Sequence, residues 1–185
     1  MTAAGGLRRM ASGPAEATDI NGEMESEMAH GEHTYRVTVE WTGNRGTGTS
    51  GYREYGRDHV IRVGSKPDIP GSSDPAFRGD AACWNPEDLL LASASACHKL
   101  WYLHLCADAG IRVLAYVDHA EGTMRDSVEP GRFTEIVLRP HVTILAGDDR
   151  ERAEHLHHDA HARCYIANSV NFPIRCEPVI ECASA

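Results

Sequence analysis

An alternation of polar and apolar residues predicts where the folded part of the chain begins. From Thr34 onward, β-forming residues alternate with polar ones in the run Tyr-Arg-Val-Thr-Val-Glu-Trp, which is typical of a strand with one buried face. His59–Val63 has a similar character, and the glycine-punctuated segment 45–51 between the two runs predicts a turn. We therefore expect an N-terminal antiparallel sheet, followed by a proline-rich loop over 65–84.

A long apolar helix is predicted directly after that loop. The triplet Asn-Pro-Glu at 85–87 suits a helix start: Asn accepts from free backbone N–H groups, Pro fits the first turn, and Glu favours the positive end of the helix dipole. The apolar residues then continue for over twenty positions and stop at Gly110. Residues 92–96 are all small, which leaves space around Cys97.

The remaining pattern predicts a hairpin, a second helix and a short final strand. Residues 113–123 and 133–145 are strand-like and flank a polar turn at 129–132. A polar helix follows at 148–162, and Val179–Cys182 is typical of a short strand. The order of strands, long helix, strands and helix indicates an α+β fold rather than alternating β-α-β units.

Residues 1–31 differ from the rest, because they are rich in Ala, Gly, Glu and Met and lack apolar periodicity. We expect a disordered arm there, with the folded domain at 32–185. The basic start at Leu7-Arg-Arg is followed by Ala-Ser-Gly-Pro and acidic residues instead of the apolar core of an export signal. The sequence thus predicts a cytoplasmic protein.

Composition narrows the range of functions. The 185 residues fit one domain with a tail, and the formal net charge of −9 argues against nucleic-acid or membrane-surface partners. The six cysteines are scattered, without a Cys-x-x-Cys pair, and are too sparse for a small disulfide scaffold. The role of these isolated thiols is therefore the main question that the composition leaves.

A peroxide-reducing thiol needs particular neighbours. It reacts as the thiolate, so it needs a cation to keep it ionised and a carboxylate to orient that cation. A second cysteine must then trap the sulfenic acid as a disulfide. Cys97, Arg45, Glu87 and Cys164 could supply these four roles, although the sequence by itself does not bring them together. We expect the other four cysteines to be structural: Cys83, Cys106, Cys176 and Cys182.

The sequence resembles the family of osmotically induced protein C and organic hydroperoxide resistance proteins (OsmC/Ohr). Three features carry the resemblance: the stretch from Asn85 to Cys97, the glycine-flanked Arg45 and the second cysteine at 164. The resemblance covers residues 34–182. It implies an α+β OsmC-like fold in an intertwined homodimer, with active sites at the subunit interface. It also implies a peroxidase that needs no cofactor and is regenerated by a dithiol reductant such as a lipoyl protein.

Carried over residue by residue, the resemblance makes Cys97 the nucleophile and Cys164 the resolving thiol. Arg45 becomes the activating cation, with Arg53 as an alternative, and Glu87 its partner. An apolar lining suited to organic hydroperoxides would come from Leu90, Leu100, Trp101 and Tyr102. The chain departs from the family at Tyr165, where Pro is frequent, and at His98, where a hydrophobic residue is frequent.

Two other functions stay open at the level of sequence. The departures at Tyr165 and His98 would suit a non-catalytic OsmC-like stress or ligand-binding protein. The histidine-rich segment His155–His161 is the other signal, because Glu154, His157 and His161 fall on one helical face and could bind a divalent metal. A solvated polar face is the ordinary interpretation of such a segment, and a core position is the ordinary interpretation of His98.

Overall fold

The computed structural model describes residues 31–127 and 130–184. A folded unit begins at Val37. The predicted disordered arm, residues 1–31, lies almost entirely outside the described residues. The unit combines three small sheets with two α-helices, so the prediction of an α+β fold is confirmed.

The N-terminal sheet contains one strand more than the sequence predicts. β1 (Thr38–Trp41), β2 (His59–Arg62) and β3 (Ile69–Gly71) pair antiparallel in the order β1-β2-β3. The loop prediction for 65–84 is therefore wrong in part, since β3 and a short 3-10 helix, η2 (Pro75–Phe77), lie within it. Prolines mark the sequence as a loop, but Pro70 tolerates a position in β3, which lies at the edge of the sheet.

β1 does not acquire the buried face that its alternating pattern predicts. All four of its residues are exposed, including Val39 at 60% and Trp41 at 42%. β1 pairs with β2, and no helix of the described chain packs extensively against it. The apolar side of this sheet is therefore uncovered within the described part of one chain.

α1 (Pro86–Asp108) is the predicted long helix, and both of its predicted ends are confirmed. At the start, Asn85 Oδ1 accepts a hydrogen bond of 2.7 Å from the backbone N–H of Asp88. At the end, Gly110 has a left-handed φ of +72°. The backbone N–H of Ile111 then reaches back to the Cys106 carbonyl, at 2.8 Å, which is the Schellman arrangement that favours glycine.

The predicted hairpin forms, but each of its arms is divided into two strands. β4 (Val113–Asp118) and β5 (Glu121–Arg125) form the first arm, and β6 (Arg132–Leu138) and β7 (Pro140–Ile144) form the second. The Asp118 carboxylate accepts a 2.7 Å hydrogen bond from the backbone N–H of Arg139, where both arms are interrupted. The interruption places β4 and β7 in one sheet and β5 and β6 in another.

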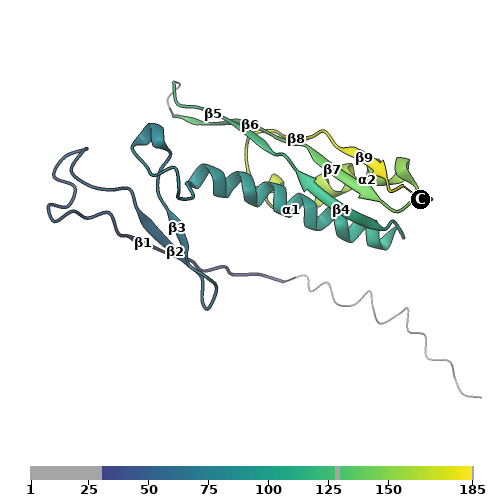
Figure 1. Cartoon of the computed structure of the whole chain (residues 1–185), viewed down its shortest axis with the longest axis horizontal. Helices are drawn as coiled ribbons and strands as arrows, with labels where there is room; N and C mark the ends of the chain where they lie inside the picture. The colour runs from purple at the N-terminus through teal and green to yellow at the C-terminus, as the bar shows by residue number, and fades with distance from the viewer. Residues whose placement is uncertain (1–30, 128–129, 185) are drawn as a thin grey trace, which may run out of the picture. The chain divides into compact units, whose positions relative to one another are not determined.

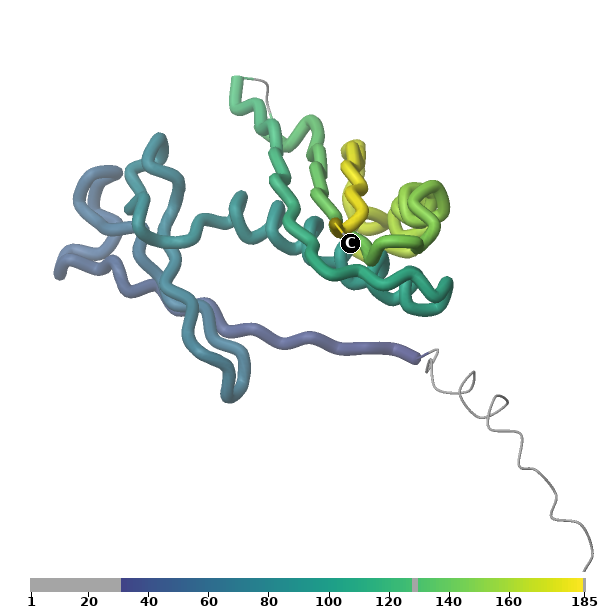
Figure 2. The backbone as a smooth tube through the Cα atoms, turned by 45° about the vertical axis from the view of Figure 1, so that its right-hand side comes forward, coloured from purple at the N-terminus to yellow at the C-terminus, as the bar shows by residue number. Residues whose placement is uncertain are grey.

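Two short C-terminal strands complete these sheets. β8 (Ile174–Cys176) pairs parallel with β6, and β9 (Val179–Cys182), which the sequence predicts, pairs parallel with β7. β8 was not predicted, because three residues are too few to establish an alternating pattern. Figures 1 and 2 show the hairpin and the C-terminal strands running beside α1.

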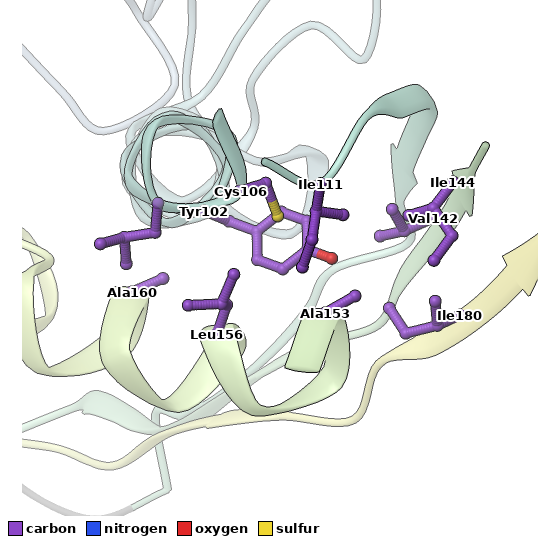
Figure 3. Packing of buried hydrophobic residues seen from close by; sticks show 10 residues of the cluster. Tyr102, Cys106, Ile111, Val142, Ile144, Ala153, Leu156, Ala160 and Ile180 are labelled. Atoms are coloured by element: carbon purple, nitrogen blue, oxygen red, sulfur yellow. The ribbon is translucent and has the colours of Figure 1, made fainter. Parts of the chain in front are cut away.

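α2 (Arg150–Arg163) is the predicted polar helix, and it begins at Asp149, whose side chain accepts from the backbone N–H of Arg152 at 2.9 Å. One face of α2 is nevertheless buried against α1. Figure 3 shows the resulting core, in which side chains from α1, α2 and the sheet of β4, β7 and β9 meet. The buried members are Tyr102, Leu105, Cys106, Ile111, Val142, Ile144, Ala153, Leu156, Ala160 and Ile180.

A second, smaller core cluster surrounds Ala94 and contains Ile136, Leu138 and Ile174. α1 thus contributes to both clusters, and Cys97 lies between Ala94 and Tyr102 along the helix. This double anchoring fixes the middle of α1. Among the described residues, no helix has both the length and the hydropathy needed to cross a bilayer.

We expect Asn85→Ala to destabilise the protein by about 1 kcal/mol, because the backbone N–H of Asp88 loses its acceptor at the helix start. Asn85→Ser, which keeps a capping oxygen, serves as the matched control and should cost much less. Urea unfolding at a fixed protein concentration measures both values. Equal stability of Asn85→Ala and the parent protein would contradict the capping role.

Candidate active site

Cys97 lies on a partly accessible face of α1. Successive residues of an α-helix are about 100° apart around the axis, so Leu90, Cys97 and Trp101 share this face. The Cys97 side chain is half-buried, whereas Leu100 beside it is 63% exposed. A small molecule can therefore approach the thiol along an apolar surface.

The structure brings Cys164 to Cys97. Cys164 follows the last turn of α2, where it is 1% exposed and its Sγ accepts from the backbone N–H of Ala167 at 3.4 Å. Burial raises the pKa of Cys164 to about 11; the Ala167 N–H opposes this rise, and a hydrogen bond with the Cys97 thiol adds to it. All cysteines of the described residues are free thiols, so this pair is in the reduced form.

Aromatic side chains cover the junction between α1 and the end of α2. Trp101, one turn after Cys97, lies edge-on to Tyr165 with ring centroids 5.7 Å apart. The guanidinium carbon of Arg163 lies 5.9 Å from the centre of the Trp101 ring. Arg163 is thus a cation near the cysteine pair, and it was not predicted from the sequence. The only feature of the sequence that could have indicated Arg163 is its position directly before Cys164.

Arg45 has different surroundings. It is exposed and lines a cavity of about 390 Å³ with residues 56–58, Pro75 and residues 78–81, and no residue of α1 contributes to this cavity. The flanking glycines, Gly46 and Gly48, have positive φ angles, and both donate backbone N–H groups to Asn44 Oδ1. The glycine pattern therefore has a local structural cause, the turn around Asn44.

Glu87 and Arg53 are not gathered at Cys97 either. Ten residues of the same helix separate Glu87 from Cys97, which corresponds to about 15 Å along the axis. Arg53 is an exposed residue of the loop between β1 and β2. Of the four predicted catalytic residues, the described chain therefore brings together Cys97 and Cys164 and leaves Arg45 and Glu87 with other neighbours.

The predicted substrate lining divides in the same way. Leu90, Leu100 and Trp101 lie on the side of α1 that carries Cys97, as the helical spacing requires. Tyr102 lies about 140° around the helix axis from Cys97 and is fully buried. Its ring stacks on the His157 ring with centroids 3.8 Å apart. Figure 3 shows Tyr102 within the core. Tyr102 is therefore a core residue and does not line the approach to Cys97.

The histidines of α2 point in different directions. His155 and His158 are exposed and stack on each other, with ring centroids 6.1 Å apart. His157 instead turns inward and is only 3% exposed. Glu154, His157 and His161, the predicted metal-binding face, line one cavity of about 550 Å³ together with residues 174–178.

Comparisons of sequence and structure agree on one family. The model of the OsmC-like protein family matches residues 79–178, more than half of the chain. No protein of curated function matches the sequence.

Among solved structures, an OsmC-like protein of unknown function from Vibrio cholerae is 27% identical, with a TM-score of 0.72 over 80% of this chain and 100% of that one. An organic hydroperoxide resistance protein from Bacillus subtilis is 22% identical, with a TM-score of 0.55 over 80% of this chain and 98% of that one. A third, from Legionella pneumophila, is described as an organic hydroperoxide resistance protein; it is 17% identical, with a TM-score of 0.57 over 80% of this chain and 97% of that one.

The two hydroperoxide resistance proteins support the fold alone at these identities. The matched segment 79–178 contains Glu87, Cys97 and Cys164, together with both helices that carry them. Since the family model covers more than half of the sequence and the fold agrees with it, the chain belongs to the OsmC-like protein family.

Proposed function

We propose that this protein is a thiol-dependent peroxidase that reduces organic hydroperoxides through Cys97 and Cys164. The observation that carries the proposal is the contact between these two thiols, one half-buried on α1 and the other buried at the end of α2. Membership of a family that includes organic hydroperoxide resistance proteins supports a role in the response to peroxide stress.

In the first step, the Cys97 thiolate attacks one oxygen of the peroxide. A sulfur–oxygen bond forms, the oxygen–oxygen bond breaks, and the alkoxide leaves and takes up a proton to become an alcohol. Cys97 is then a sulfenic acid, oxidised by two electrons. The raised pKa of Cys164 keeps that thiol protonated at neutral pH, so it does not compete for the peroxide.

In the second step, Cys164 attacks the sulfur of the Cys97 sulfenic acid. A disulfide forms, and the hydroxyl group leaves with the Cys164 proton as water. A dithiol reductant, such as a lipoyl protein, then returns two electrons and becomes a disulfide itself. Sulfur carries all of the electrons, so the cycle requires no cofactor. We assign it to the cytoplasm, where thiols are kept reduced.

We further propose that the site is completed in a homodimer. The uncovered apolar face of β1 offers a surface for a second copy of the chain. The separation of about 15 Å between Glu87 and Cys97 along α1 excludes a contact between them within one helix. Two-fold symmetry allows the partner subunit's Glu87 and the partner subunit's Arg45 to approach Cys97, with Arg163 as the cation of the same chain.

We expect Cys97→Ser to reduce the turnover of cumene hydroperoxide with dihydrolipoamide to the uncatalysed rate, because the nucleophile is lost. Cys164→Ser should reduce one equivalent of peroxide per chain and then stop, because no disulfide forms. Cys182→Ser, which changes an exposed thiol, is the matched control and should keep full turnover.

Peptide mapping after one equivalent of peroxide should find a disulfide between Cys97 and Cys164. Full turnover by Cys97→Ser would refute the proposed nucleophile. A wild-type protein that binds hydroperoxide but does not turn it over would instead favour a non-catalytic ligand-binding role.

Arg45→Ala should lower turnover by roughly a hundredfold, the usual effect of removing one electrostatic stabiliser.

If Arg45 acts across the dimer interface, Arg45→Ala and Cys97→Ser subunits should complement each other. An equal mixture, unfolded and refolded together, should recover about a quarter of the wild-type turnover, because half of the dimers are mixed and each has one complete site. Recovery in the mixture of Cys97→Ser with Arg163→Ala would identify Arg163 as the cation that acts across the interface. An equal mixture of Arg45→Ala and Cys97→Ser without any recovery would exclude this role for Arg45.

A further inference from the structure

Three side chains from three different elements converge on one point, two of them buried and one half-buried. His98 comes from α1, His157 from α2 and Cys176 from the end of β8. His98 is 1% exposed and His157 is 3% exposed. One ligand atom from each residue lies within 4.8 Å of the other two.

The distances among these atoms resemble the edges of a tetrahedral metal site. His98 Nε2 lies 2.9 Å from His157 Nδ1, and Cys176 Sγ lies 3.5 Å from the first nitrogen and 3.8 Å from the second. With Zn–N bonds of about 2.0–2.1 Å and Zn–S bonds of about 2.3 Å, tetrahedral geometry gives N–N edges of about 3.3 Å and N–S edges of about 3.6 Å. A movement of a few tenths of an ångström would therefore suffice.

The two imidazoles have the protonation state that metal ligation requires. Burial lowers the pKa of His98 to about 4 and that of His157 to about 3, so both rings are neutral at pH 7. Each ring also has a second nitrogen, Nδ1 of His98 and Nε2 of His157, without a hydrogen-bond partner among the described residues. When a metal takes the facing nitrogens, the ring protons reside on these second atoms.

Cys176 is unsuited to the alternative role of a second nucleophile. Burial raises its pKa to about 12, so the thiol stays protonated at neutral pH although two imidazoles adjoin it. A metal ion changes this balance, because its charge stabilises the thiolate and the thiol proton leaves to solvent. Two neutral imidazoles and one thiolate then form a ligand set that suits Zn²⁺ rather than Mg²⁺ or Ca²⁺.

A fourth ligand can reach the ion from one side. The cavity of about 550 Å³ beside α2 is lined by both His157 and Cys176. Glu154 and His161 line the same cavity, so a carboxylate, a third imidazole or a water molecule is available for the open position. The cavity also provides a route by which an ion enters the otherwise buried site.

We propose that His98, His157 and Cys176 form a binding site for a divalent transition-metal ion with the ligand preferences of Zn²⁺. The site joins α1, α2 and β8, and His98 directly follows the proposed nucleophile Cys97. A bound ion therefore fixes the two helices that bring Cys97 and Cys164 together. Of the three residues that the pattern on α2 predicts as ligands, the site uses only His157. Its other two ligands, His98 and Cys176, lie outside that helix.

Cobalt(II) is the probe for a test with the full-length chain, because tetrahedral thiolate–Co²⁺ sites have a charge-transfer band in the near ultraviolet. The parent protein carries Cys97→Ser and Cys164→Ser, so that these thiols do not contribute to the band. We expect one Co²⁺ per chain with this band, displacement by Zn²⁺, and a higher melting temperature with Zn²⁺ than with a chelator.

Adding Cys176→Ser should abolish the thiolate band, and His157→Ala should weaken Co²⁺ binding by at least about a hundredfold. Cys182→Ser and His155→Ala change an exposed thiol and an exposed histidine outside the cavity, and they are the matched controls that should bind like the parent. Circular dichroism of each variant verifies that it is folded.

The site is refuted if the folded parent binds no Co²⁺, if the thiolate band survives Cys176→Ser, or if His155→Ala weakens binding as much as His157→Ala. These measurements use no peroxide, so their outcome is independent of the peroxidase proposal.

Discussion

The packing of α1 against α2 is the interaction on which the other features depend. Tyr102 and Leu105 from α1 meet Leu156 and Ala160 from α2 in one apolar core. Because α2 is otherwise polar, burial of this narrow face is what holds it against α1. The same packing brings Cys97 to Cys164 and, on the buried side of α1, His98 to His157. Cys97 and His98, which are neighbours in α1, thus each have a partner: Cys164 directly after α2, and His157 within it.

The two pairs differ because they lie on different sides of α1. Cys97 is on the half-exposed side, which is open to small molecules such as the substrate and product of the proposed reaction. His98, about 100° around the axis, is inside, where burial keeps its ring neutral. The chemistry open to each pair follows from this difference: exchange with small molecules for the thiols, and ligation of an ion that enters through the cavity beside α2 for the histidines.

The described part of one chain also leaves features that a second copy of the chain would explain. Apolar residues of β1 are uncovered, and Glu87 is too far along α1 to act at Cys97 in the same helix. The alternating pattern of β1 is that of a buried face, and its exposure among the described residues leaves a surface that the proposed second copy would cover. The proposed dimer relates both observations to one cause.

The sequence by itself determined the elements whose signals are local. Asn85 and Gly110 mark the ends of α1 because capping and a left-handed φ depend on neighbouring residues only. The motif from Asn85 to Cys97 likewise indicated the family, and the resemblance implied the pair of Cys97 and Cys164. Only the tertiary structure placed Tyr102 in the core, Arg163 beside the Trp101 ring, and His98, His157 and Cys176 at one point. Those placements depend on which faces of distant elements pack together, and a short-range pattern of residues does not contain that information.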